Sequence, residues 1–189
     1  IQITDVLIEG ERIQKIGSIP AQDQYHLVDG RGKYLFPGVI DGQVHFRDPG
    51  LTHKADLTSE SKAAIAGGVT SFIEMPNTRP NTLTLELWAD KYELASTKSL
   101  ANYGFLLGIT ADNLDEVIQW DTSKHLAITD DGLYFTGKGN ILADQPAMLE
   151  KLFAAHKGLI AIHSEKEEII EKNEELYREK YGENVPIAC

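Results

Sequence analysis

The feature that most constrains the fold is an alternation of strand-like and helix-like segments from residue 38 onward. Apolar stretches that look like strands begin near residues 39, 69, 103, 125 and 159, and each is followed by a segment with helical patterning. The repeat of roughly 30 residues is that of a βα unit, in which parallel strands are joined by helical crossovers. The sequence therefore predicts an α/β fold with about five βα units.

Two arrangements of such units fit this local pattern. Five strands could complete a small open, doubly wound sheet, whereas a closed (β/α)8 barrel of the TIM type needs eight units and about 250 residues. The chain has 189 residues, so a barrel would be an incomplete one. Five units would leave apolar strand edges and inner helix faces uncovered. We therefore expect the chain to be a fragment of a longer protein, or another segment to supply the rest.

Residues 1–36 follow a different pattern. Short apolar stretches flank the turn Glu9-Gly10-Glu11, which predicts a β-hairpin. A second strand-like piece covers Tyr34–Phe36 and ends at Pro37. We therefore divide the chain into a first part, residues 1–36, and a βα part, residues 37–189.

Charge and composition exclude several classes of protein. The net charge of −11 disfavours binding to nucleic acid or to an anionic membrane surface. No apolar run approaches the roughly 18 residues that span a bilayer, and the first residues lack the pattern of a secretory signal. The single cysteine, Cys189, has no partner for an internal disulfide, which favours a reducing, cytoplasmic setting.

Side chains that can bind metals or substrates gather at the predicted carboxyl ends of the strands, where α/β folds build their sites. They are His45, Glu74, Asn77, Asp130, Asp131 and His163. Imidazole and carboxylate together suit zinc or a similar divalent ion. We predict that His45, Asp131 and His163 meet at one rim, the edge formed by the carboxyl ends of the strands, and hold a metal there. Asp130 is the alternative to its neighbour Asp131.

The first predicted strand carries an unusual polar face. Alternation places Asp41, Gln43 and His45 on the same side, and three polar groups on one strand face are costly unless they bind something. The alternative is a polar cluster satisfied by ordered water. The other four histidines are interpreted as structural: His26, His53, His125 and His156.

Several motifs together resemble those of the dihydroorotases in the amidohydrolase superfamily. Phe36–Gly50, with the sequence FPGVIDGQVHFRDPG, resembles the first-strand motif of that family. Ala66–Thr70 and Met75–Thr78 resemble its second βα unit, and Ile162–Glu165 its fifth-strand histidine motif. The resemblance runs from about Ile3 to the end of the chain, and the motifs occur in the family's order.

The resemblance implies a fold and a metal site. Residues 1–36 would be part of a small β-sandwich, and residues 37–189 the first part of a metal-dependent (β/α)8 barrel. One or two zinc ions would be held by His45 as the second first-strand ligand, Asp131 as the fourth-strand bridging carboxylate and His163 as the fifth-strand ligand.

The resemblance also implies a reaction on a small molecule. This is the reversible cyclisation of N-carbamoyl-L-aspartate to dihydroorotate, a step of pyrimidine biosynthesis, in an enzyme that often forms homodimers. Arg47 and Asn77 would bind the substrate carboxylate, and a planar guanidinium suits a carboxylate physically. These two residues favour dihydroorotase over allantoinase or hydantoinase, which are the enzymatic alternatives.

Two departures from the family pattern affect this interpretation. The family usually has His-x-His on the first strand, where this chain has Gln43-Val44-His45. An amide oxygen is a poorer zinc ligand than imidazole, so the metal held by that pair should be weak or missing. A catalytically inactive scaffold or partner subunit is therefore the alternative of another class. The family's strand-six histidine and its strand-eight acid, the catalytic base, would lie beyond Cys189.

Overall fold

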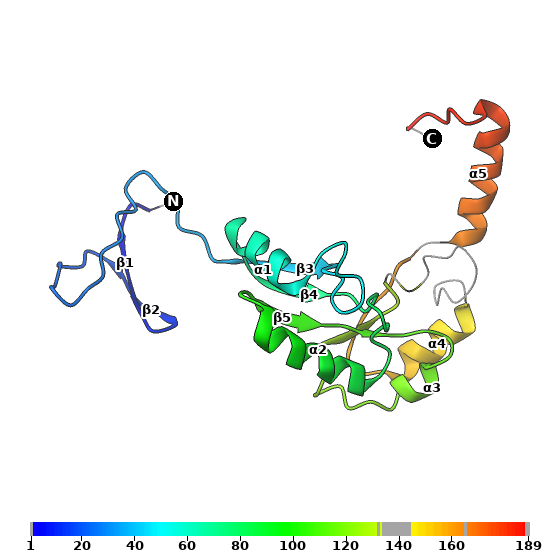
Figure 1. Cartoon of the computed structure of the whole chain (residues 1–189), viewed down its shortest axis with the longest axis horizontal. Helices are drawn as coiled ribbons and strands as arrows, with labels where there is room; N and C mark the ends of the chain where they lie inside the picture. The colour runs from blue at the N-terminus through cyan, green and yellow to red at the C-terminus, as the bar shows by residue number, and fades with distance from the viewer. Residues whose placement is uncertain (1, 132, 134–144, 165, 188–189) are drawn as a thin grey trace. The chain divides into compact units, whose positions relative to one another are not determined.

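The computed structural model describes residues 2–131, 133, 145–164 and 166–187. The chain divides into two compact units, Ile1–Pro37 and Gly38–Cys189, whose elements are labelled in Figure 1. In the part of the chain described, no helix has both the length and the apolar character needed to cross a membrane.

The first unit contains a β-hairpin, as predicted. Strand β1 (Asp5–Glu9) pairs antiparallel with β2 (Arg12–Gly17). Gly10 lies in the connecting turn with φ of 60°, a conformation that glycine adopts without the steric cost of a Cβ atom.

The predicted second strand at Tyr34–Phe36 is wrong. These residues belong to no described strand, and their side chains are 70–74% exposed. The reason is that β-structure needs a partner, and the described sheet of this unit consists of β1 and β2 alone. The assignment of residues 1–36 to a β-sandwich stays a prediction.

The second unit is built on parallel strands. They are β3 (Val39–Val44), β4 (Val69–Glu74), β5 (Asn102–Phe105), β6 (Leu107–Gly108), β7 (Ala127–Thr129) and β8 (Leu159–Ala161). Strands β3, β4 and β5 form one sheet, and β6, β7 and β8 form another. Only Leu106 separates β5 from β6, and its N–H donates to the Glu74 carbonyl at 3.0 Å. One stretch of chain therefore joins the two sheets.

The order of these strands bears on the choice between a barrel and a doubly wound sheet. Within each of the two sheets, every described strand pairs in parallel with the next along the chain. A doubly wound sheet reverses its strand order at a switch point, and the described strands have no such reversal. The α/β class with parallel strands is confirmed, and the progressive order favours a barrel wall.

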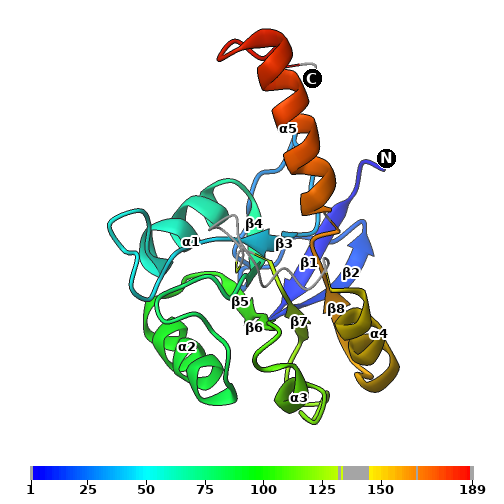
Figure 2. The same ribbon diagram turned by 90° about the vertical axis from the view of Figure 1, so that its right-hand side faces the viewer.

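Helices alternate with the strands. They are α1 (Leu57–Ala66), α2 (Leu85–Lys98), α3 (Leu114–Val117), α4 (Pro146–Ala155) and α5 (Glu167–Tyr181). Figure 2 shows α1 to α4 in an arc along the outside of the strands. Side-chain caps start the first two helices: Asp56 accepts the Ser59 N–H at 2.8 Å, and Thr84 accepts the Leu87 N–H at 3.2 Å.

The apolar core lies between the strands and these helices. One buried cluster, centred on Leu57, Phe72 and Phe105, joins α1 and α2 to the first sheet. A second cluster, centred on Ile128 and Leu152, joins α3 and α4 to the second sheet. These two clusters join helices to strands, and a third, smaller buried cluster consists of Met75, Leu106 and Ala127.

Two histidines interpreted as structural are buried against each other. His125 precedes β7 and His156 follows α4, and they are 7% and 5% exposed. Their rings stack with centroids 5.6 Å apart. None of their ring nitrogens has a hydrogen-bond partner among the described residues. Burial lowers the pKa of both histidines, and at His156 the neighbouring His125 lowers it further.

This pair predicts acid sensitivity of the fold. The folded-state pKa values lie below the unfolded value of about 6.5. The contribution of the neutral rings to the free energy of unfolding is therefore complete above that pH. Stability should fall as the pH drops below about 6.5, by at most about 1.4 kcal/mol per histidine at pH 5.5. Urea unfolding at pH 7.5 and 5.5 measures this loss. We expect His156→Leu to reduce the pH dependence and the exposed His53→Gln to leave it unchanged. An equal pH dependence in all three proteins would contradict the prediction.

Candidate active site

The carboxyl ends of β3, β7 and β8 bring together the three predicted metal ligands. His163 Nε2 lies 2.8 Å from Asp131 Oδ1, and His45 Nε2 lies 3.6 Å from Asp131 Oδ2. The Asp131 side chain is only 8% exposed, whereas the imidazoles are 29% and 32% exposed. The three residues are far apart in sequence, and they meet because parallel strands end at the same edge.

Gln43 contacts the same carboxylate. Its Nε2 donates to Asp131 Oδ2 at 2.6 Å. Gln43 and His45 are two residues apart, so both reach the rim from one face of the chain around β3. An ionised carboxylate can only accept hydrogen bonds, which is why the amide nitrogen of Gln43 faces it.

The contact between His45 and Asn77 sets the tautomer of the imidazole. His45 Nδ1 lies 2.9 Å from Asn77 Oδ1, and an amide oxygen is an acceptor only. His45 therefore carries its proton on Nδ1 and presents the lone pair of Nε2 to the Asp131 carboxylate. Two facing acceptors repel each other, so this arrangement suits a cation between them.

The donor chemistry of this rim suits zinc. Two imidazoles and one carboxylate are ligands that zinc accepts. Within the ranges that the structure describes, no group of three His, Cys, Asp or Glu side chains has the arrangement of a metal centre. The donor types of His45, Asp131 and His163 match those of a zinc site, and the metal role of these residues stays a prediction.

Asp130 has a different position from Asp131. It is 1% exposed, and its Oδ1 accepts the backbone N–H of His163 at 2.9 Å. Its Oδ2 has no hydrogen-bond partner in the described part of the chain, and burial raises its pKa. Asp131 is thus the residue that faces the histidines, while Asp130 holds the backbone of one of them. Sequence reasoning missed this second role, and the only signal for it was the adjacent pair of carboxylates.

A cavity of about 410 Å³ opens at this rim. Polar groups of Gln43, Asp131 and His163 line it together with the apolar side chains of Met75 and Leu106. A volume in this range and a mixed lining are typical of sites for small molecules.

The two predicted substrate ligands follow β3 and β4. The guanidinium of Arg47 makes no ion pair or hydrogen bond with a described residue, and the neighbouring Asp48 pairs with Lys98 at 2.8 Å. Asn77 is 5% exposed, and its Nδ2 has no partner among the residues described. Two unpaired donors suit a carboxylate. Neither residue is among the described side chains that line the 410 Å³ cavity.

Two further polar residues of the predicted strand ends do not join the rim. Asp41 accepts the backbone N–H of Gln43 at 3.1 Å. Glu74 is fully buried and forms an ion pair with Lys91 of α2 at 2.9 Å. The described hydrogen bond of Asp41 is therefore to the backbone of its own strand, and the ion pair of Glu74 is to a helix residue.

Comparison with known proteins identifies the family. Residues 32–175 match the family described as Dihydro-orotase-like. The chain belongs to this family, which confirms the resemblance drawn from the motifs.

The similar proteins are named dihydroorotases and allantoinases. The chain is 34% identical over 177 residues to a dihydroorotase of Lactococcus lactis, covering 89% of this chain and 40% of that protein. It is 32% identical to a dihydroorotase of Bacillus cytotoxicus, covering 100% and 45%. An allantoinase of Desulfitobacterium hafniense is 36% identical over 118 residues, covering 62% and 26%.

A solved structure agrees with the fold. The L-hydantoinase of Arthrobacter aurescens superimposes with a TM-score of 0.69 and 26% identity, over 95% of this chain and 41% of that one. The chain thus spans less than half the length of each of these relatives.

Proposed function

We propose that the protein carrying this chain is a zinc-dependent dihydroorotase, which interconverts N-carbamoyl-L-aspartate and dihydroorotate in pyrimidine biosynthesis. The observation that carries the proposal is that His45, Asp131 and His163 meet at one rim in a chain of the dihydroorotase-like family. Because an allantoinase is also among the relatives, the choice of substrate depends on Arg47 and Asn77, whose free donors suit a carboxylate.

Each residue of the rim has a role in this proposal. His45, Asp131 and His163 would hold the ion, which when bound lowers the pKa of a water toward 7 and polarises a carbonyl. Asn77 keeps the Nε2 lone pair of His45 available through the contact at 2.9 Å, and Asp130 fixes the backbone of His163. As the family resemblance implies, we place the group that transfers the proton outside this chain.

The proposal includes the rest of the fold. We propose that residues 37–189 are the first part of a (β/α)8 barrel and that residues 1–36 belong to a small β-sandwich. The progressive strand order supports a barrel, and so do the exposed side chains of Ile40 (68%) on β3 and Leu159 (66%) on β8. Further strands would cover these apolar groups. A cytoplasmic location and a homodimer are parts of the same proposal.

Zinc analysis and substrate turnover test the proposal. The longest natural protein that contains this chain is purified, its zinc content is measured, and it is assayed with dihydroorotate, allantoin and hydantoin. Stoichiometric zinc with a preference for dihydroorotate supports the proposal. A preference for allantoin or hydantoin would reassign the substrate, and the absence of both metal and turnover would favour the inactive scaffold.

The scaffold is a second candidate because of one contact. The amide of Gln43 donates to Asp131 Oδ2 at 2.6 Å, where the family's first-strand histidine would be a metal ligand. If that oxygen is permanently held by the amide, the rim binds metal poorly, and the protein serves as a partner subunit.

Replacing Gln43 with histidine tests the effect of this amide. We expect Gln43→His to raise zinc affinity by roughly 10- to 100-fold, because an imidazole is the better ligand and the hydrogen bond to Asp131 is lost. Competition with a chromophoric chelator measures the affinity. The exposed Gln119→His, which adds the same imidazole on the surface of the protein, is the control. Equal affinities in both variants would show that Gln43 does not limit metal binding.

A further inference from the structure

A buried ion pair lies beneath the strand ends. Glu74 and Lys91 are 0% and 2% exposed, and Glu74 Oε2 lies 2.9 Å from Lys91 Nζ. The ammonium also donates to the Met75 carbonyl at 3.3 Å and lies 4.7 Å from the centroid of the Phe105 ring. Burial raises the pKa of Glu74 and lowers that of Lys91, and the attraction between them opposes both shifts. Buried ion pairs contribute little to the free energy of unfolding, and some of them instead fix one particular local conformation.

The second oxygen of Glu74 holds the backbone of Arg47. Glu74 Oε1 accepts the Arg47 N–H at 3.0 Å. Arg47 has φ of 69° and is the one non-glycine residue with positive φ among the residues described. A side chain in this region is strained, so the conformation persists only where the surroundings hold it. The Arg47 carbonyl is held as well, because it accepts the Leu51 N–H at 3.0 Å.

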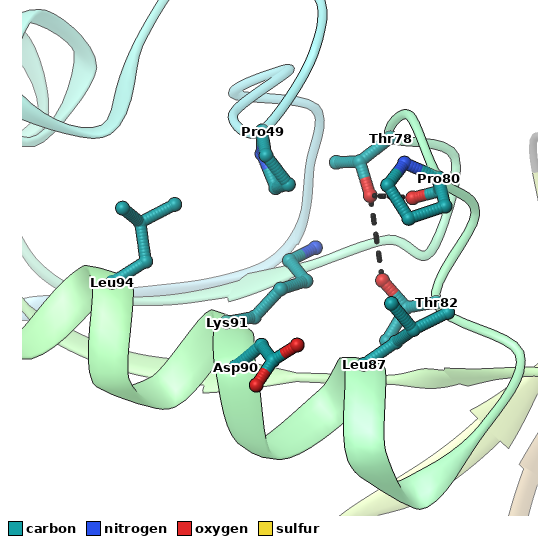
Figure 3. A pocket seen from close by; sticks show the side chains of 8 residues that line it. All are labelled: Pro49, Thr78, Pro80, Thr82, Leu87, Asp90, Lys91 and Leu94. Atoms are coloured by element: carbon teal, nitrogen blue, oxygen red, sulfur yellow. Dashed lines mark hydrogen bonds between the residues drawn. The ribbon is translucent and has the colours of Figure 1, made fainter.

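The same pair lies next to the loop that carries Asn77. The loops after β3 and β4 are joined by a hydrogen bond from the Arg79 N–H to the Pro49 carbonyl at 3.1 Å. Figure 3 shows Lys91 extending from α2 toward these loops, beside a cavity of about 270 Å³ that Pro49 and Thr78 also line. Thr78 ties the second loop together by donating to the Pro80 carbonyl at 2.9 Å. The ion pair is thus part of the support of both substrate-binding loops.

We propose that Glu74, balanced by Lys91, is a positioning residue that holds Arg47 in its left-handed conformation and so sets the direction of the guanidinium toward the substrate carboxylate. The inference rests on the proposed function, because Arg47 is a substrate ligand only in that reaction. Glu74 touches no substrate and acts through one backbone hydrogen bond. The buried lysine supplies the charge that lets a carboxylate remain there.

Two matched double variants isolate that hydrogen bond. E74Q/K91M keeps an acceptor oxygen for the Arg47 N–H, whereas E74M/K91M replaces it with a side chain of similar shape and no strong acceptor. Both remove the buried charges. We expect the KM for dihydroorotate to be roughly 10- to 100-fold higher in E74M/K91M than in E74Q/K91M, with a smaller change in kcat, because a misplaced binding group weakens substrate positioning.

A double-mutant cycle with Arg47→Ala separates positioning from a general structural effect. If Glu74 acts through Arg47, the ratio of KM values between the two double variants should fall to about one once the guanidinium is removed. A ratio that persists in the Arg47→Ala background would overturn the inference.

Amide hydrogen exchange provides a measurement that does not depend on activity. The Arg47 amide should exchange at least about tenfold more slowly in E74Q/K91M than in E74M/K91M. If the wild-type protein fails to turn over dihydroorotate, the proposed function fails, while this comparison still reports on the contact between Glu74 and Arg47. Equal exchange rates would overturn the contact itself.

A folding readout covers the case in which E74M/K91M does not fold. Glycine adopts φ of 69° without help, so adding Arg47→Gly to that variant should restore folding. Circular dichroism and thermal unfolding measure the restoration, and its absence would contradict the inference.

Discussion

Replacing Asp131 with asparagine is expected to abolish stoichiometric zinc binding and to lower dihydroorotate turnover by roughly a thousandfold. Three side chains contact the Asp131 carboxylate. His163 Nε2 lies 2.8 Å from Oδ1, and His45 Nε2 and Gln43 Nε2 lie 3.6 Å and 2.6 Å from Oδ2. A metal stabilises developing charge by several kcal/mol, and about 4 kcal/mol corresponds to a thousandfold in rate. Zinc content and steady-state kinetics of the full-length variant measure both effects.

Asp130→Asn is the matched control for this substitution. Asparagine keeps an oxygen that can accept the His163 N–H, so we expect a much smaller loss of zinc and turnover than at Asp131. Equal losses in the two variants would show that the carboxylates are required for folding rather than for metal binding. Full zinc content in Asp131→Asn would remove Asp131 from the proposed ligands.

Replacing Arg47 with alanine is expected to raise the KM for dihydroorotate roughly 100-fold. The guanidinium has no partner among the described residues, so its removal leaves no buried charge unpaired in the free protein. A charged hydrogen bond to the substrate carboxylate contributes about 1.5–3 kcal/mol, which corresponds to roughly 10- to 100-fold in affinity. A dihydroorotate analogue that lacks the carboxylate should be hydrolysed at the same rate by the wild type and by the Arg47→Ala variant.

Arg79→Ala is the control for the Arg47 substitution. Arg79 is exposed on the loop after β4, and its backbone N–H, which alanine retains, donates to Pro49. We expect its KM to stay within about twofold of the wild type, since surface side chains away from a site have small effects. A large effect of Arg47→Ala on the ring that lacks the carboxylate would indicate a role for Arg47 other than carboxylate binding.

Local patterns in the chain predicted the elements that carry the site. Alternating apolar segments identified the strands around Val39, Val69 and Leu159, and the turn at Gly10 identified the hairpin. The motif with His45 and Arg47 identified the family, which the match over residues 32–175 confirms. These features are readable because side-chain periodicity and turn residues act over a few neighbouring positions.

The same local reading failed where a distant partner was needed. Tyr34–Phe36 has the composition of a strand and forms none, because no described strand pairs with it. The strand order, which favours a barrel over a doubly wound sheet, also depends on pairings between distant segments. Periodicity says that a segment is extended but does not say which segment lies beside it.

The contacts among the residues of the rim could not be predicted either, because they also depend on which strands lie side by side. The sequence predicted Asp131 as the ligand and left Asp130 as its alternative. The strand ends place Asp131 against two imidazoles and Asp130 against a backbone N–H. Local sequence dictated that acids and histidines stand at strand ends. Which of them touch, and that Glu74 reaches the backbone of Arg47, depends on contacts across tens of residues, which form only when the strands assemble side by side.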